Sequence, residues 1–205
     1  MRAYRAGALR LPGSIVVIGA FDGVHVGHQK VIGGAVRASR SLALPAVVYT
    51  FDPPPKALFS GAKVLTDIDE KLRRLSLLAP DYATVASFDR DYATRPAEDF
   101  IIELMLLNPI AVWVGADFRF GAGRKGDIEL LSRRFAVRLV DAVRCRQGEV
   151  ISSTRIRNLI AKGDELGAQA LLGWRTPTPS RPAIFRSAFG GRAAAGNEPV
   201  DLAAA

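Results

Sequence analysis

Short apolar runs alternate with segments of helical periodicity along most of the chain, and this alternation limits the fold more than any other feature. Strands are expected at 15–20, 46–51, 84–88, 110–115 and 137–143. Helices are expected between and after them, at 28–42, 68–78, 96–107, 128–135, 155–162 and 164–172, with Thr66 as the N-cap of the second. Such alternation predicts an α/β fold with a doubly wound, mainly parallel sheet, whose ligands bind beyond the carboxyl ends of the strands.

The alternation stops after Trp174, where Pro, Gly, Ala and Arg dominate. We therefore predict one domain at 1–174 and a poorly ordered tail at 175–205. No apolar run approaches the ~18–20 residues that cross a bilayer, and the N-terminus lacks the apolar stretch of a signal peptide. The single cysteine, Cys145, excludes an intramolecular disulfide. These features predict a cytoplasmic protein without a membrane partner, and Cys145 is expected to be a small strand residue.

The formal net charge is +8, and basic residues are densest at 119–146. This balance favours anionic partners, and nucleic acids and polyphosphate ligands both qualify. The chain contains no recognised nucleic-acid-binding motif. We therefore expect a polyphosphate ligand and no nucleic acid, and the sequence does not indicate the oligomeric state.

The first chemical motif, IGAFDGVHVGHQ at 18–29, follows the first strand and opens the first helix. Gly19 and Gly23 allow a tight turn close to a ligand. His25 and His28, the only histidines of the chain, share one face of the first helical turn. The N-terminus of a helix favours anions, so two imidazoles there could hold a phosphate. The alternative is that both histidines only cap or pack the helix.

Two further motifs follow the second and fourth strands. The first is YTFDPPP at 49–55, where the chain leaves the sheet. Its prolines should make this segment extended and stiff. VGADFRFGAGRKGD at 114–127 combines four glycines with charged and aromatic side chains. Such a mixture suits a heteroaromatic ligand with phosphates. From composition alone, the segment at 49–55 is better interpreted as a stiff exit loop, and the alternative for 114–127 is a solvated glycine-rich loop.

The fourth motif is ISSTRIR at 151–157. Ser152 and Ser153 are natural N-caps, and Thr154 adds a hydroxyl. Arg155 and Arg157 follow in the first turn, with Arg155 able to point outward. Hydroxyls, backbone N–H groups and a guanidinium would converge on a departing pyrophosphate, whereas an ordinary capped helix with surface arginines is the simpler alternative.

Together the motifs resemble those of the nucleotidylyltransferase superfamily, and in particular the adenylyltransferase module of bacterial FAD synthetases. The resemblance covers about 15–174 and implies a Rossmann-like nucleotidylyltransferase fold, ATP and FMN as substrates and Mg²⁺ as cofactor. It implies that catalysis involves His25, His28 and Arg157. The implied ATP-binding residues are Gly19, Phe21, Asp22, Gly27, His28, Gly115, Asp117, Ser152, Ser153, Thr154 and Arg157. The implied FMN-binding residues are Phe51, Asp52, Pro53, Pro55, Asp117, Phe118, Phe120, Arg124 and Asp127.

Two departures from the family pattern keep alternatives open. Pro54 stands where the family usually has a histidine near the flavin phosphate, so the acceptor could be another small phosphorylated molecule. A flavin- or nucleotide-binding protein without catalysis is a further alternative. The residues after Trp174 are too few for the riboflavin kinase domain that commonly follows this module, so the chain is expected to be either monofunctional or truncated.

Overall fold

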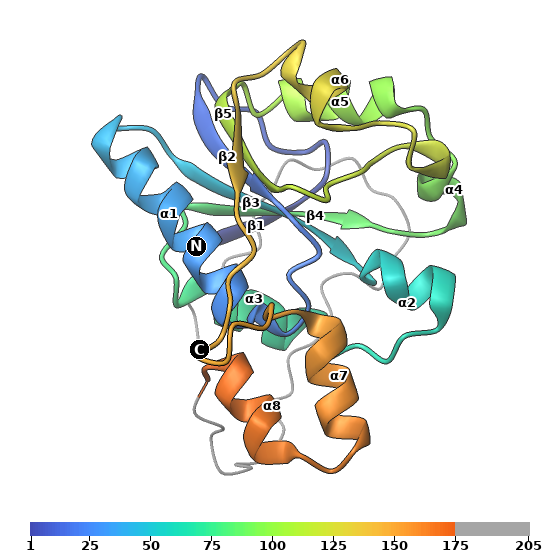
Figure 1. Cartoon of the computed structure of the whole chain (residues 1–205). Coiled ribbons are helices and arrows are strands. Elements are labelled where there is room, and N and C mark those ends of the chain that lie inside the picture. Colours follow the sequence, from blue (N-terminus) through green and yellow to red (C-terminus); the bar gives the residue numbers. More distant parts are fainter. Residues whose placement is uncertain (175–205) are drawn as a thin grey trace.

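The computed structural model describes residues 1–174, which form one six-stranded sheet in the order β1-β4-β3-β2-β5-β6 (Figure 1). The strands are β1 (Arg2–Arg5), β2 (Ser14–Ile18), β3 (Ala46–Asp52), β4 (Tyr82–Ser87), β5 (Pro109–Gly115) and β6 (Val137–Val140). All pairings between these strands are parallel. The predicted α/β class and parallel sheet are thus confirmed. The predicted tail at 175–205 lies outside the described residues.

Helices connect the strands and cover both faces of the sheet (Figure 1). They are the 3₁₀ turn η1 (Asp22–Val24), α1 (Val26–Ser41), α2 (Pro55–Ser60), α3 (Ile68–Ser76), α4 (Arg90–Ala93), α5 (Ala97–Met105), the 3₁₀ turn η2 (Ala122–Arg124), α6 (Ile128–Ser132), α7 (Ser153–Ala161) and α8 (Glu165–Leu172). Most lie where the periodicity predicts them, within a few residues.

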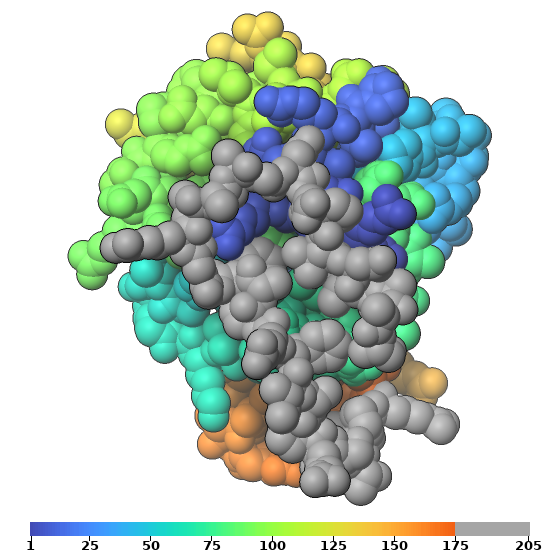
Figure 2. Space-filling view, turned by 180° about the vertical axis from the view of Figure 1, so that it is seen from behind, coloured from blue at the N-terminus to red at the C-terminus, as the bar shows by residue number. Residues whose placement is uncertain are grey.

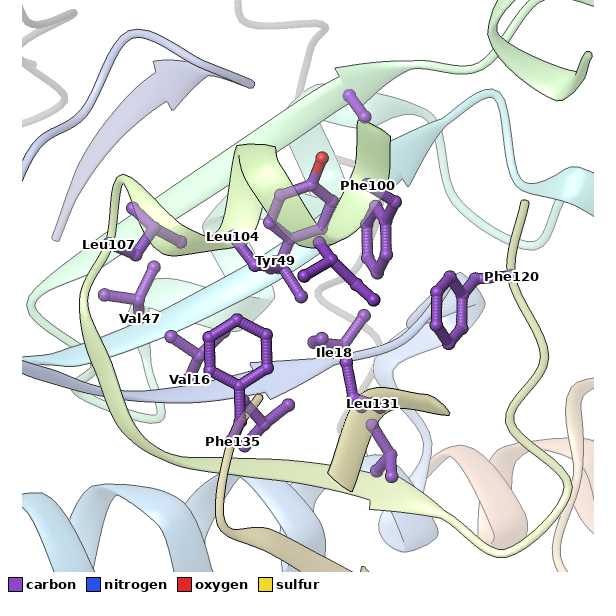
Figure 3. Packing of buried hydrophobic residues seen from close by; sticks show 14 of the residues in the cluster. Val16, Ile18, Val47, Tyr49, Phe100, Leu104, Leu107, Phe120, Leu131 and Phe135 are labelled. Atoms are coloured by element: carbon purple, nitrogen blue, oxygen red, sulfur yellow. The ribbon is translucent and has the colours of Figure 1, made fainter. Parts of the chain in front are cut away.

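Alternation of side chains along the strands builds a core on each face of the sheet. In β2, Val16 and Ile18 point to the face covered by α5 and α6, where Leu104 and Leu131 pack against them (Figure 3). Ile15 and Val17 point to the opposite face, which α1 and α3 cover. Period-2 alternation in a strand whose two faces are both buried gives the continuous apolar run seen in the sequence.

The strand order fixes where a ligand can bind. From β2 the chain proceeds through β3 and β4 on one side, and it then returns to place β5 and β6 on the other side. The direction in which successive strands are added to the sheet therefore reverses at β2. The crevice at such a switch point is the usual ligand site of an open α/β sheet. The first three motifs follow β2, β3 and β5, which are neighbours in the sheet.

α7 and α8 form a separate layer beyond the first motif. Their small core consists of Ile151, Ile156, Ala168 and Leu171. Figure 1 shows this orange pair below α3, and Figure 2, from behind, shows it at the base of the molecule. This placement carries the fourth motif to the loop that follows β2.

Three local expectations are wrong. Asp67, not Thr66, caps α3 by accepting a hydrogen bond from the Glu70 N–H (2.8 Å), because the Thr66 hydroxyl instead accepts from the Gly23 N–H (3.2 Å). The prolines of the second motif do not continue as an extended segment, since Pro55 takes the first position of α2, where its fixed φ fits. The last strand ends at Val140, and Cys145 lies in a turn beyond it.

Candidate active site

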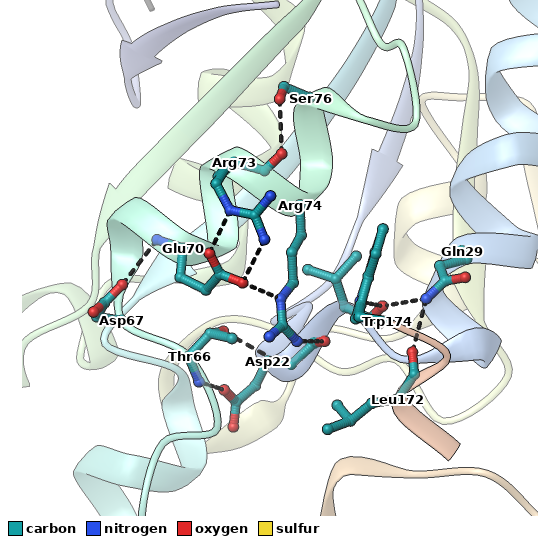
Figure 4. A network of polar contacts seen from close by, with 12 residues as sticks. Asp22, Gln29, Thr66, Asp67, Glu70, Arg73, Arg74, Ser76, Leu172 and Trp174 are labelled. Atoms are coloured by element: carbon teal, nitrogen blue, oxygen red, sulfur yellow. Dashed lines mark hydrogen bonds and ion pairs between the residues drawn. The ribbon is translucent and has the colours of Figure 1, made fainter. Parts of the chain in front are cut away.

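The loop between β2 and α1 has an unusual backbone. Phe21 and Val24 adopt φ values of 47° and 44°, a left-handed conformation that is unfavourable for a β-branched residue. The Val24 carbonyl is held by two donors, Gln29 Nε2 (2.9 Å) and Trp174 Nε1 (2.8 Å) (Figure 4). Gly19 is required at the start of the loop, because a Cβ there would lie 2.8 Å from the Phe21 ring. Strain that surrounding contacts maintain is typical of functional sites.

The loop presents both histidines at the N-terminus of α1. His25 is the N-cap, and its Nδ1 accepts a hydrogen bond from the His28 N–H (3.3 Å). The two rings are stacked, with centroids 3.5 Å apart and planes 19° apart. Gly27 allows this arrangement, because a Cβ there would lie 3.0 Å from the His25 ring. The three-residue spacing thus brings both imidazoles together as the sequence predicts, and the pair also caps the helix.

Burial keeps the two imidazoles neutral at neutral pH. It lowers the pKa of His25 to about 4, against the opposing charge of Asp22. It also lowers the pKa of His28 well below its usual value, and the neighbouring His25 and Lys71 lower it further. His28 Nδ1 is buried and finds no hydrogen-bond partner in the described part of the chain. The pair can therefore donate hydrogen bonds to a phosphate, but it carries no fixed positive charge.

Asp22 joins the first motif to the fourth. Its buried carboxylate accepts hydrogen bonds from the N–H groups of Leu65 (2.9 Å) and Thr66 (3.3 Å) and forms an ion pair with Arg157 (Figure 4 shows the Thr66 contact). Its backbone carbonyl accepts from Ser153 Oγ (3.0 Å). These contacts dock the N-terminus of α7 beside the histidine pair, and they occupy one end of the Arg157 guanidinium.

The other side chains of the fourth motif contact two different parts of the molecule. Ser152 caps α7 through the Arg155 N–H (3.2 Å). Thr154 Oγ1 accepts from Lys56 Nζ (3.0 Å), which reaches across from α2. Arg155 instead pairs with Glu149 and donates to Cys145 Sγ (3.3 Å), away from Asp22. Hydroxyls of the fourth motif therefore face the second motif as well as the first.

The predicted FMN-binding residues lie at the ends of β3 and β5. Phe51 is buried in an aromatic cluster, and Asp52 beside it is half-buried, which raises the pKa of its carboxyl group against the charge of Lys71. Pro53 is exposed, and the Asp52–Pro53 peptide bond is cis. Pro55 begins α2. These residues border the histidine loop because β3 and β2 are adjacent.

The third motif forms a closed loop after Gly115. Phe118 and Phe120 stack with centroids 5.5 Å apart, and Phe120 exchanges two backbone hydrogen bonds with Gly126 (3.0 and 2.9 Å). Asp127 caps α6 by accepting from the Leu130 N–H (2.9 Å). Asp117 and Arg124 are exposed. The roles of these residues toward ATP and FMN remain predictions, and for Asp127 the structure provides a helix-capping role.

Two lysines at the site were missed in the sequence. Lys71 is completely buried and donates to the Phe51 carbonyl (2.7 Å), and Lys56 contacts Thr154. For Lys71 a signal existed, because it shares the apolar face of α3 with Ile68 and Leu75, and lysine is almost never found buried without a reason. Lys56 left no such signal, since its partner lies 98 residues away in sequence.

Within residues 1–174, no three His, Cys, Asp or Glu side chains lie close enough together to hold a metal ion. No helix in that range is both long and apolar enough to cross a bilayer.

Comparisons with known proteins agree with this geometry. Residues 9–155 match the FAD synthetase family. A protein of Geobacillus thermodenitrificans named as a bifunctional riboflavin kinase/FMN adenylyltransferase is 52% identical over 175 residues, covering 85% of this chain and 98% of that protein. The Escherichia coli K12 protein of that name is 39% identical over 171 residues, and the match covers 78% of this chain and 54% of the relative. The chain therefore spans nearly the whole of one relative and about half of the other.

A solved structure has the same fold. The crystal structure described as a macrolide-efflux protein from Streptococcus pneumoniae superposes with a TM-score of 0.73 at 30% identity, covering 83% of this chain and 60% of that one. The family match spans three of the four motifs completely and reaches into the fourth. The order of the motifs, the stacked histidines at the switch point and these similarities lead to one conclusion: the chain belongs to the FAD synthetase family.

Proposed function

We propose that this protein transfers AMP from ATP to FMN and so forms FAD and pyrophosphate. The observation that carries the proposal is the stacked pair of His25 and His28 at the N-terminus of α1, to which Asp22 docks the fourth motif. Anions bind at helix N-termini, and here two imidazoles and the hydroxyls of α7 add donors. The names of the family and of the relatives support FMN as the acceptor.

In the proposed reaction, an oxygen of the FMN phosphate attacks the α-phosphorus of ATP. The bond from that phosphorus to the oxygen bridging to the β-phosphate breaks, and pyrophosphate leaves with the electron pair. The attacking phosphate is already a nucleophile, so the protein needs no general base. Catalysis then depends on in-line positioning and on donors directed at the charge that develops on the α-phosphate.

Mg²⁺ would neutralise phosphate charge in this reaction. The described residues offer no three-ligand cluster, so we propose that the ion is held mainly by phosphate oxygens and water, as Mg²⁺ often is beside nucleotides. We also propose that the enzyme works in the cytoplasm and needs neither a nucleic acid nor a membrane partner.

The test is to incubate the purified protein with ATP, Mg²⁺ and a panel of phosphorylated acceptors that includes FMN, and to identify products by mass. We expect FAD and pyrophosphate in equal amounts, no reaction without Mg²⁺, and no product from the His25→Ala, His28→Ala double variant. Lys162→Met, on an exposed residue at the end of α7, serves as the control. If another acceptor is adenylylated instead of FMN, the assignment of FMN as the acceptor is wrong, but the assignment of adenylyl transfer stands. Binding without pyrophosphate release would indicate a non-catalytic protein.

A further inference from the structure

Lys71 on α3 is a buried cation that the proposed mechanism has not used. Its side chain is 0% exposed. Lysine is almost never fully buried unless it is paired, and within residues 1–174 no carboxylate oxygen lies within 4.0 Å of its ammonium group. A charge in this position is expensive to bury, so its retention calls for a physical reason.

The ammonium group has unused hydrogen-bonding capacity. It carries three donors, and the Phe51 carbonyl at the end of β3 accepts one of them (2.7 Å). No second protein acceptor for Lys71 occurs in the described part of the chain. A buried donor without an acceptor is costly, whereas an anionic ligand would satisfy the remaining two.

The ammonium group interacts electrostatically with charged and titratable groups of both motifs. Burial lowers the pKa of Lys71, and the carboxylates of Asp52 and Asp22 oppose that effect. Its own charge contributes to the lowered pKa of His28. Lys71 Nζ contacts the end of β3 within the second motif, and His28 Nδ1 in the first motif is also buried and without a partner among residues 1–174. Two incompletely satisfied nitrogen groups thus belong to the first two motifs, which follow the adjacent strands β2 and β3.

We propose that Lys71 Nζ binds a phosphate oxygen at the α-phosphate of ATP and supplies the fixed positive charge of the reaction centre. This inference rests on the proposed adenylyl transfer. The neutral histidines can donate hydrogen bonds to the developing charge but cannot neutralise it. Arg157 shares its charge with Asp22. Lys71 has no such ion pair among residues 1–174, and its contact with Phe51 fixes its ammonium group in place before the substrate arrives.

A purely structural role for Lys71 makes a different prediction. If it only holds the Phe51 carbonyl, its loss would displace the second motif, and the KM for FMN would rise with little change in kcat. If it contacts the α-phosphate in the transition state, kcat falls and the KM for FMN changes little. The two roles are therefore separated by the kinetic parameter that changes.

The first experiment compares Lys71→Met and Lys71→Arg with Lys162→Met. Methionine retains most of the length of the side chain without the charge, and Lys162 is an exposed lysine outside the site. For Lys71→Met we expect kcat to fall by ~10²–10³, the typical loss of one preorganised donor, with partial recovery in Lys71→Arg and wild-type rates in Lys162→Met. A folded Lys71→Met variant with kcat within about twofold of wild type, or with only a raised KM for FMN, would overturn the proposal.

The second experiment observes the wild-type chain, so it does not depend on the folding of Lys71→Met and needs Lys71→Arg only to assign the signal. Lysine side chains are labelled with ¹⁵N at Nζ, and the Lys71 signal is assigned by its absence in Lys71→Arg. Addition of Mg²⁺ and an ATP analogue with a methylene group between the α- and β-phosphates should shift that signal and slow its hydrogen exchange. An unchanged signal at saturation would overturn the inference. A shifted signal in a protein that forms no FAD would reject FMN as the acceptor while supporting the role of Lys71.

Discussion

Charge and burial of single side chains account for most of the chemistry available at this site. His25 and His28 are neutral because they are buried, yet they sit at a helix N-terminus where anions are favoured. A neutral donor contributes most when charge increases on its partner. The histidine pair is therefore suited to the transition state, whereas the ion-paired Arg157 is suited to holding substrate and structure.

Replacing His28 with alanine should lower turnover far more than it weakens ATP binding. Loss of one preorganised donor typically lowers kcat by ~10²–10³, while Mg²⁺ and Arg157 would still hold the triphosphate. kcat is measured by pyrophosphate release and the Kd for ATP by calorimetry. Arg157→Ala is the comparison, and it should affect both quantities because it also leaves buried Asp22 without its cation. A near wild-type kcat with collapsed ATP affinity in His28→Ala would show that the histidine acts in the ground state.

The lowered pKa of His25 makes folding stability depend on pH. The unfolded chain binds a proton at His25 near pH 6.5, but the folded chain does so only near pH 4. Stability from this residue is therefore complete above pH 6.5 and declines as the pH falls toward 4, by about 2 kcal/mol at pH 5. Urea denaturation at pH 7.5 and pH 5 should show a larger loss in wild type than in His25→Gln. Equal losses would contradict the burial of a neutral imidazole.

Helices and strands with a strong hydrophobic period, or with a motif at one end, could be predicted from the sequence. Elements whose local sequence signals are weak or conflicting could not. β1 was missed because Arg2–Arg5 is four residues long and carries an arginine at each end. α2 was missed because the prolines before it indicate an extended chain, although Pro55 fits the first helical position. The motifs at the ends of β2, β3 and β5 were placed correctly, since parallel topology alone brings those ends together.

The contacts between residues far apart in the sequence are the part of the site that could not be predicted. The pairing of Asp22 with Arg157 joins residues 135 apart, and neither residue identity nor spacing indicates it. The same holds for Lys56 and Thr154. Their positions depend on where α7 docks, which is settled by the packing of Ile151 and Ile156 rather than by the motif.

The corrected cap of α3 gives a prediction for this element. Asp67→Ala should destabilise the protein by about 1 kcal/mol, since the side chain caps the Glu70 N–H and lies at the favourable end of the helix dipole. Asp69→Ala, at the second residue of the same helix and also exposed, removes an equal charge without removing a cap. The free energies of unfolding of both variants are compared with wild type in urea. A larger effect for Asp69 than for Asp67 would contradict the cap assignment.

For the whole molecule, contacts at the end of α8 connect the periphery to the reaction centre. Gln29 Nε2 donates to both the Val24 and the Leu172 carbonyls (2.9 Å each), and Trp174 Nε1 donates to Val24 as well (Figure 4). The Trp174 ring also lies 5.8 Å from the Arg74 guanidinium. The left-handed Val24 is thus held from a position 150 residues away.

This connection predicts where the chain can be shortened. Removal of 175–205 should leave the melting temperature within ~4 °C of the full chain and leave kcat unchanged, because residues 1–174 already supply donors that hold the histidine loop, Trp174 among them. Trp174→Ala in the full chain should behave differently. It removes a donor to the strained Val24 and part of the packing around Arg74, so the melting temperature should fall by about 4 °C or more, as for a loss of ~1–2 kcal/mol in a domain of this size. kcat should fall with it, since relaxation of Val24 would shift His25 at the next position. Calorimetry and pyrophosphate release on the two proteins provide the comparison. A large loss on truncation would show that the tail packs on the domain, and unchanged stability and kcat in Trp174→Ala would show that Val24 needs no support from Trp174.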